Sequence, residues 1–174
     1  NANRSISLPS GDGYFQVWTG FTMNVPGAIS GAGTLVKSDG GTLNYSGTGS
    51  AGNTRIEGGT LQLSGGGLNM GTAAYLSSAT LAITGGNHSA TQFRTSEGSG
   101  TQSTINHSAG TFNVTGSVNS GTSSSFLLTH WSGGAASTYN LSGGVLNAPN
   151  APLNLGWDGT ARLIQTGRPA HLQG

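Results

Sequence analysis

Short segments in which hydrophobic and small polar residues alternate recur along this chain, and helical periodicity is sustained nowhere. Pairs of such segments, joined by a corner of small residues, return at 33–45, 53–63, 103–114 and 137–148, with a shorter relative at 79–86. A period of two predicts β-strands that bury one face. Because the same unit returns along the chain, the pattern favours a solenoid.

A third strand in each unit emerges when the second half of the chain is aligned with itself. Further alternating segments begin at three positions, Phe93, Leu127 and Leu153. Each of these three segments is followed by another strand, and these strands contain Ile105, Tyr139 and Leu163. They continue the series of apolar residues that begins with Leu43, Leu61 and Leu81. The repeat therefore has roughly 18–25 residues, apart from a Ser/Gly-rich insertion near 116–125 that suits an exposed loop.

We therefore predict an all-β fold, a right-handed, single-stranded parallel β-helix (β-solenoid) with three short strands per coil and roughly seven coils. Its coils turn several corners within a few residues, and the 32 glycines supply the backbone conformations that such corners need. Apolar residues then form one column inside, and Thr, Asn, Gln and Ser form ladders outside. A β-sandwich is the rival fold, but its strands need not resemble one another as these do.

Domain organisation follows from where the repeats begin. Residues 25–174 are assigned to the β-helix and residues 1–24 to an N-terminal cap or docking segment. Its expected cap or assembly contacts are four aromatic residues: Tyr14, Phe15, Trp18 and Phe21. At the other end only Pro169 blocks the strand edge after Gly167, so either the chain continues or that edge docks onto another subunit and builds a filament.

Composition limits the partners of this chain. Only 6% of its residues are Asp, Glu, Lys or Arg, and the formal net charge is +1, whereas an ordinary domain has about 25% charged residues. The surface therefore lacks the basic footprint of a nucleic-acid-binding protein. No apolar run reaches the roughly 18 residues of a membrane span, so we expect no membrane insertion by this segment.

Catalytic chemistry is not expected from the five acidic residues, Asp12, Asp39, Glu57, Glu97 and Asp158. Glycoside hydrolysis needs two carboxylates held roughly 5–10 Å apart, and these five fall at non-equivalent points of the repeat. The chain also lacks the Gly-x-Ser-x-Gly elbow that presents a serine nucleophile. We therefore predict no catalytic residue, no enzyme activity and no cofactor.

Metal ligation is not expected either. The three Asp-Gly pairs stand singly and far apart, where Asp acts as a turn residue, whereas a calcium cage needs six or more oxygens. The four histidines lack His, Cys or Asp partners at metal-site spacing. His107 takes the strand position of Leu141 in the next unit, which indicates a position that tolerates substitution.

Two tryptophans give the one indication of a binding surface. Trp131 and Trp157 occupy equivalent places in consecutive units, so they are expected to stack along one face or corner. If exposed, the pair makes a platform for sugars or for a partner; if buried, it closes the core at a wide corner. A large aromatic residue at a repeated position is more often structural, and both interpretations stay open at this point.

A nine-residue segment, Ile-Ser-Gly-Ala-Gly-Thr-Leu-Val-Lys at 29–37, is followed by Gly-Thr-Leu-Gln-Leu at 59–63. These two motifs resemble the start and end of the autotransporter-associated passenger β-helix repeat, and the resemblance covers residues 25–65. Later units are similar to looser repeats in large secreted proteins of environmental bacteria. The resemblance implies export, a cell-surface or extracellular location and a β-helical stalk, but no particular activity.

These features predict an extracellular structural or adhesive β-helix scaffold of a bacterial surface protein. The expected partners are further copies of the chain, through end-to-end assembly, or host and cell-surface glycans. One alternative is a subunit of a head-to-tail extracellular filament built by stacking of β-helix ends. The other is a carbohydrate-binding or polysaccharide-degrading β-helix.

Overall fold

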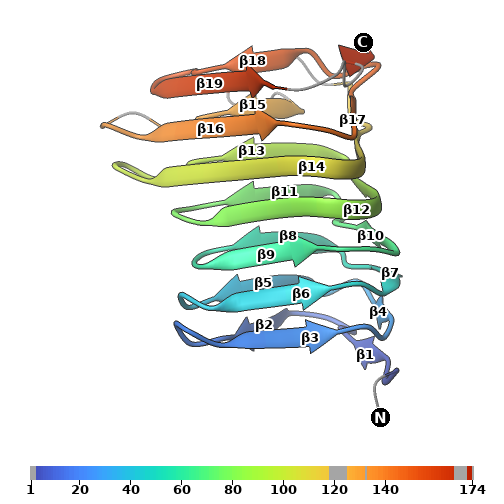
Figure 1. The fold of residues 1–174 in the computed structure, drawn as a ribbon. Helices are drawn as coiled ribbons and strands as arrows, with labels where there is room; N and C mark the ends of the chain where they lie inside the picture. Colours follow the sequence, from blue (N-terminus) through green and yellow to red (C-terminus); the bar gives the residue numbers. More distant parts are fainter. Residues whose placement is uncertain (1–2, 118–124, 132, 167–171, 174) are drawn as a thin grey trace.

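The computed structural model describes residues 3–117, 125–131, 133–166 and 172–173, and every regular element in these ranges is a β-strand. Strands of successive coils pair in parallel, and about seven coils stack along one axis (Figure 1). The chain is thus an all-β parallel β-solenoid, as the repeats predict. The described part holds no helix able to cross a membrane.

The coils contribute to three sides of the solenoid. The first sheet takes one strand from each coil: β2 (Asp12–Gln16), β5 (Thr34–Ser38), β8 (Asn53–Ile56), β11 (Ala73–Leu76), β13 (Gln92–Thr95), β15 (Phe126–Leu128) and β18 (Leu153–Leu155). The second sheet contains β3 (Thr22–Val25), β6 (Thr42–Tyr45), β9 (Thr60–Leu63), β12 (Thr80–Ala90), β14 (Gln102–Val114), β16 (Ala136–Leu141) and β19 (Thr160–Gln165).

The third side consists of shorter strands. Its members are β1 (Ile6–Ser7), β4 (Ile29–Ser30), β7 (Thr48–Ser50), β10 (Gly67–Asn69), β17 (Val145–Asn147), β20 (Leu172–Gln173) and the C-terminal parts of β12 and β14. In the β12 and β14 coils, one long strand rounds the corner between the second sheet and this side. Their pairing register shifts between Ile83 and Thr84 and again between Thr84 and Asn87, as at a β-bulge, which bends a strand locally.

The predicted apolar series in the second sheet is confirmed. Each member pairs in register with the next, in the order Met23, Leu43, Leu61, Leu81, Ile105, Tyr139 and Leu163. His107 likewise pairs with both Ile83 and Leu141, as its predicted equivalence to Leu141 requires. From Leu43 to Tyr139 the apolar members of the series belong to one continuous core, and Leu163 packs against it, whereas Met23 is 41% exposed.

The strand predicted to begin at Leu127 is β15 of the first sheet, and it begins one residue earlier, at Phe126. Phe126, not Leu127, pairs with Phe93 and with Leu153. Phe126, Leu127 and Leu128 are all buried, so this strand lacks the alternation that normally specifies which residues face the core. The predicted equivalence of Trp131 and Trp157 is wrong for the same reason.

The stretch from Ile6 to Val25 forms the first coil, and its strands β1, β2 and β3 pair with β4, β5 and β6. Phe15 lies in the core, whereas Tyr14, Trp18 and Phe21 are 57%, 73% and 67% exposed. The role of these aromatics as a cap or in assembly stays a prediction. The insertion expected near 116–125 lies largely outside the described residues, and the edge from Gly167 to Pro169 lies wholly outside them.

Aromatic rings fill the core in the second half of the stack. Phe93 meets Phe112 edge to face, with ring centroids 5.0 Å apart, and Phe126 at 6.0 Å. Phe126 in turn meets Tyr139 at 6.5 Å. Edge-to-face pairs are favourable beyond the area they bury, so these coils gain packing energy that the leucine-rich first half lacks.

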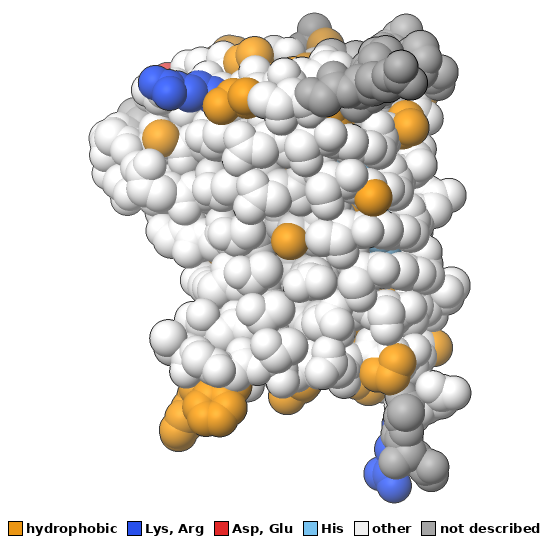
Figure 2. All heavy atoms as spheres, viewed as in Figure 1, with side chains coloured by type: hydrophobic (Ala, Val, Ile, Leu, Met, Phe, Trp, Pro, Cys, Tyr) orange, Lys and Arg blue, Asp and Glu red, His pale blue; other side chains and the backbone are white. Residues whose placement is uncertain are grey.

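Outside the core, amide ladders connect neighbouring coils without charge. Asn44 donates to Asn24 at 2.9 Å, Asn140 donates to Asn106 at 2.9 Å, and a third ladder links Asn147, Asn113 and Asn87. Viewed onto the second sheet, the surface is almost entirely uncharged, and hydrophobic side chains collect near the two ends of the stack (Figure 2).

Lys37 is fully buried and closes a corner between the first and second sheets. Its Nζ donates to three carbonyl oxygens, those of Ser38 at 2.7 Å, Asp39 at 2.8 Å and Gly58 at 3.1 Å. Burial lowers the pKa of Lys37, and the nearby Asp39 carboxylate partly opposes this effect. The lysine that ends the 29–37 motif therefore has a structural role, since it satisfies carbonyls of two successive coils.

Two histidines are buried inside the solenoid with both ring nitrogens engaged. Leu68 N–H donates to His88 Nδ1 at 3.1 Å, so the proton of His88 sits on Nε2, which donates to Gly85 O at 2.8 Å. His107 Nδ1 lies 2.9 Å from Tyr139 Oη, and its Nε2 lies 3.3 Å from Gly110 O. Burial lowers the pKa of both imidazoles, and the nearby His88 lowers the pKa of His107 further.

We predict that Gly71→Ala destabilises the protein far more than Gly20→Ala. Both glycines have a left-handed φ, 88° and 86°, so both variants incur roughly 1–2 kcal/mol of backbone strain. Only at Gly71 does an added Cβ collide with backbone, that of Gly52 in the coil below, whereas nothing lies within 4 Å of a Cβ at Gly20. Urea unfolding should place Gly71→Ala at least about 2 kcal/mol below Gly20→Ala, and equal losses would contradict close backbone stacking.

We predict that acid weakens the fold through the two buried histidines. Because their folded-state pKa values are lowered, the unfolded chain binds protons more tightly, and stability falls as the pH drops below about 6.5. The slope reaches at most about 1.4 kcal/mol per pH unit for each histidine. His107→Leu combined with Tyr139→Phe should remove about half of this slope when unfolding is measured at pH 7, 6 and 5.

Candidate functional site

Charge is scarce in this chain, and much of it gathers on the outer face of the first sheet. Of the six basic and five acidic residues, this face and the turns beside it hold Asp12, Arg55, Glu57, Arg94 and Glu97. His130 follows β15 on the same side. Among the described residues, charge therefore concentrates on the outer face of the first sheet.

Register brings these side chains into two rows along the axis. The first row follows outward positions of the strands, with Tyr75 paired to both Arg55 and Arg94. The second row lies just beyond the strand ends, where Ser77 N–H donates to Ile56 O at 2.9 Å and Glu97 N–H donates to Leu76 O at 3.4 Å. This bonding places Glu57, Ser77 and Glu97 at equivalent points of successive coils. The prediction that all five acids are non-equivalent is therefore wrong for Glu57 and Glu97.

A hollow of about 400 Å³ lies between these rows. It is lined by Arg55, Ile56, Glu57, Tyr75, Ser77 and Glu97. Residues from three successive coils thus contribute one aromatic and four polar or charged side chains, whereas the Ile56 side chain is buried in the core. Binding sites typically combine an apolar lining with a few convergent polar groups, and this hollow has both.

Arg55 holds the N-terminal part of the face together. Its Nη2 lies 2.7 Å from Asp12 Oδ2, and its Nε lies 3.1 Å from Glu57 Oε1. These side chains are between 35% and 42% exposed, so solvent screens the pairs and each is worth at most about 1 kcal/mol. Arg55 therefore orients Glu57 more than it stabilises the fold.

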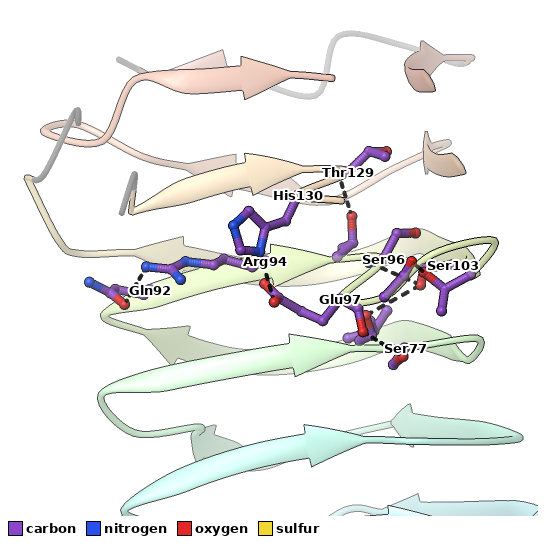
Figure 3. A network of polar contacts seen from close by, with 12 residues as sticks. Ser77, Gln92, Arg94, Ser96, Glu97, Ser103, Thr129 and His130 are labelled. Atoms are coloured by element: carbon purple, nitrogen blue, oxygen red, sulfur yellow. Dashed lines mark hydrogen bonds and ion pairs between the residues drawn. The ribbon is translucent and has the colours of Figure 1, made fainter. Parts of the chain in front are cut away.

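Tyr75 and Arg94 form the middle of the face. The Arg94 guanidinium lies over the Tyr75 ring, 5.8 Å from its centroid, within the range of a cation–π contact. Arg94 also donates to Gln92 Oε1 at 3.1 Å (Figure 3). The ring of Tyr75 is thereby fixed at the wall of the hollow.

Glu97 and His130 meet across neighbouring coils. His130 Nδ1 lies 2.8 Å from Glu97 Oε2, as Figure 3 shows. Glu97 Oε1 is shielded from solvent and has no hydrogen-bond partner among the described residues. The His130 ring meets Trp131 edge to face at 5.6 Å. The polar row is thus continuous from Glu57 through Glu97 to an exposed tryptophan.

A buried network of hydroxyl groups lies beneath Glu97 and His130. Ser96 Oγ donates to Ala136 O at 2.7 Å, Ser137 Oγ lies 2.6 Å from Thr95 Oγ1, and Thr129 Oγ1 donates to Thr160 O at 2.7 Å. Ser96 and Thr129 have left-handed φ values of 55° and 65°, which cost a non-glycine residue about 1–3 kcal/mol. Because each directly precedes a residue of the face, the strained corner fixes where Glu97 and His130 leave the strand.

The two tryptophans predicted as a platform are each about half exposed, 48% for Trp131 and 49% for Trp157. They are not stacked equivalents, because Trp157 N–H donates to Thr129 O at 3.1 Å and Trp157 therefore lies opposite His130. Their role as a platform stays a prediction. Sequence reasoning missed Arg55, Tyr75 and Arg94, although charged residues at outward strand positions are a visible signal in so uncharged a chain.

Within the described ranges, no group of three or more His, Asp or Glu residues is placed to hold a metal ion. No family model, no curated protein and no solved structure matches this chain. The fold and this face therefore define the class of the protein by themselves: a parallel β-solenoid with one charged, aromatic-bearing face.

We predict that Ser96→Ala destabilises the protein by about 1–3 kcal/mol, because it removes a buried donor and leaves neighbouring polar groups unpaired. Ser99→Ala is the matched control: Ser99 is exposed and donates a long hydrogen bond to Gly133 O at 3.3 Å, so its loss should stay within about 0.5 kcal/mol. Urea unfolding of both variants measures the difference. Equal effects would show that the hydroxyl network does not hold the corner.

Proposed function

We propose that this chain is a structural and adhesive β-solenoid module of an exported bacterial surface protein. The observation that carries the proposal is the uninterrupted stack of parallel coils around one apolar column. In such a stack each strand bonds to the coil above and the coil below, so bending the rod would break hydrogen bonds in several coils at once. A stiff rod of this kind suits a stalk that presents a binding surface away from the cell.

The resemblance of residues 25–65 to passenger β-helix repeats supports the same function. It also supports a location at the cell surface or outside the cell. Lys37, the last residue of the matched start motif, satisfies three corner carbonyls. The motif therefore has a physical reason to recur in solenoids of this type.

The alternative within the same class is a filament built by stacking of solenoid ends. Large apolar side chains are exposed on the first coil, at Trp18 and Phe21, and on the last described coils, at Leu155 and Ile164. A further coil of the same chain or a second copy would each cover such side chains. Sedimentation of the purified chain separates these cases, because only copies that stack produce species longer than one chain.

Surface display tests the adhesive function. Bacterial cells that display the chain on an outer-surface anchor should be retained under flow on a panel of polysaccharide coatings, compared with cells that display the anchor alone. Cells that display Gly71→Ala should lose this retention, because adhesion depends on the folded stack.

Two outcomes would contradict the proposal. Absence of retention on every coating would remove the adhesive role. Release of reducing ends from the polysaccharides by the purified chain would identify a degrading enzyme in place of a scaffold.

A further inference from the structure

We propose that the outer face of the first sheet, from Arg55 to Trp131, binds an uncharged glycan chain that runs along the solenoid axis. The proposal rests on the proposed function, because it names the ligand of the adhesive surface. Its argument uses the shape, hydrogen-bonding groups, aromatic rings and rigidity of this face.

The shape of the face suits an extended ligand. The hollow of about 400 Å³ is within the usual range of small-ligand sites, and Glu57, Ser77 and Glu97 follow one another on successive coils about 4.8 Å apart. One sugar residue of an extended glycan has a length similar to this spacing. A chain of sugars therefore meets an equivalent polar position at each step, whereas a single sugar fills only part of the row.

The hydrogen-bonding groups point to hydroxyls. Arg55 offers donors and Glu57 offers acceptors, and the Ser77 hydroxyl, which donates to Glu97 O at 3.1 Å, still accepts. Glu97 offers only the remaining lone pair of Oε2 beside His130, because its Oε1 is shielded from solvent. Opposite charges already compensate each other through the pairs Arg55–Asp12, Arg55–Glu57 and His130–Glu97. A strongly charged ligand would have to break these pairs. A hydroxyl group donates and accepts at once, so it fits between them.

Aromatic rings complete the match to sugars. Tyr75 lines the hollow, and the half-exposed Trp131 continues the row beyond His130. The C–H faces of sugar rings pack against aromatic rings, which combine large apolar area with polar neighbours. The apolar part of the ligand is thereby held in the middle of the polar row, at Tyr75, and beyond its end, at Trp131.

The site is already rigid in the unliganded chain. The buried hydroxyls beneath it fix the corners at Ser96 and Thr129, and Arg55 and Arg94 hold Glu57 and Tyr75 in place. A ligand that meets fixed side chains loses less conformational freedom of the protein on binding. Few contacts per sugar are then sufficient for a weak but repeated interaction along the chain.

Calorimetric titration of the purified chain with four neutral hexasaccharides, cellohexaose, hexa-N-acetylchitohexaose, laminarihexaose and mannohexaose, tests the proposal. At least one should bind, and Glu97→Gln should weaken it roughly tenfold or more, because a charged hydrogen bond is lost at nearly constant shape. Trp131→Ala should weaken the same ligand by a similar factor. Asp39→Asn and Trp18→Ala, which change an exposed acid and an exposed tryptophan that do not line the hollow, should stay within about twofold.

Salt dependence and folding serve as the internal controls. Binding of a neutral glycan should change little between low and high salt, since no exposed ion pairs form. Thermal unfolding should show Glu97→Gln and Trp131→Ala folded at the titration temperature, and Tyr75→Phe, which keeps the ring, should retain most of the affinity.

Three results would overturn the inference: no hexasaccharide binds, Glu97→Gln and Trp131→Ala bind like the wild type, or affinity falls steeply with salt, which would identify a charged ligand. If any of these results is found while cells displaying the wild type are still retained on a polysaccharide coating, the glycan site proposed here is wrong and the adhesive function remains supported. If the wild-type cells are not retained at all, the proposed function itself is wrong.

Discussion

The backbone hydrogen bonds between successive coils are the interaction on which the rest of this structure depends. They hold each strand about 4.8 Å from the strand above and below, so every side chain lies next to the residue at the same register in two other coils. Most core positions are consequently apolar along the axis, and asparagine stacks on asparagine outside. The same spacing explains Gly71, whose backbone lies so close to Gly52 that no Cβ fits between them.

This constraint also decides how much of the fold the sequence can reveal. The series from Leu43 to Tyr139 was predictable, because stacked core positions repeat one kind of side chain and alternate with polar neighbours. The register of Phe126 was not, because Leu127 is buried as well although it pairs with the outward-facing Arg94. When both faces of a strand are covered, alternation disappears, and only the neighbouring coil specifies the register.

The candidate site was hidden from sequence reasoning by the similarity of the corners. The Gly-Gly pair at 40–41 joins the first sheet to the second, whereas the pair at 143–144 joins the second sheet to the third side. Aligning units by their glycines therefore superimposes strands from different sides of the solenoid. Glu57 and Glu97 looked non-equivalent in that alignment, although the stack places Ser77 between them in a single row.

Stacking also explains why ligand-binding groups can occur on the first sheet and not on the asparagine ladders. In a parallel stack, identical charges on adjacent coils would repel at about 5 Å, and one neutral coil between them roughly halves the Coulomb energy. The charged face follows this rule, since Ser77 separates the glutamates and Tyr75 separates Arg55 from Arg94. Arg55 pairs with Glu57 and His130 with Glu97, and Glu97 Oε1 has no hydrogen-bond partner among the described residues. The ladder amides already bond to their equivalents in the next coil, so they have less left to offer a ligand. Spacing the charges by one coil therefore lets the stack tolerate them.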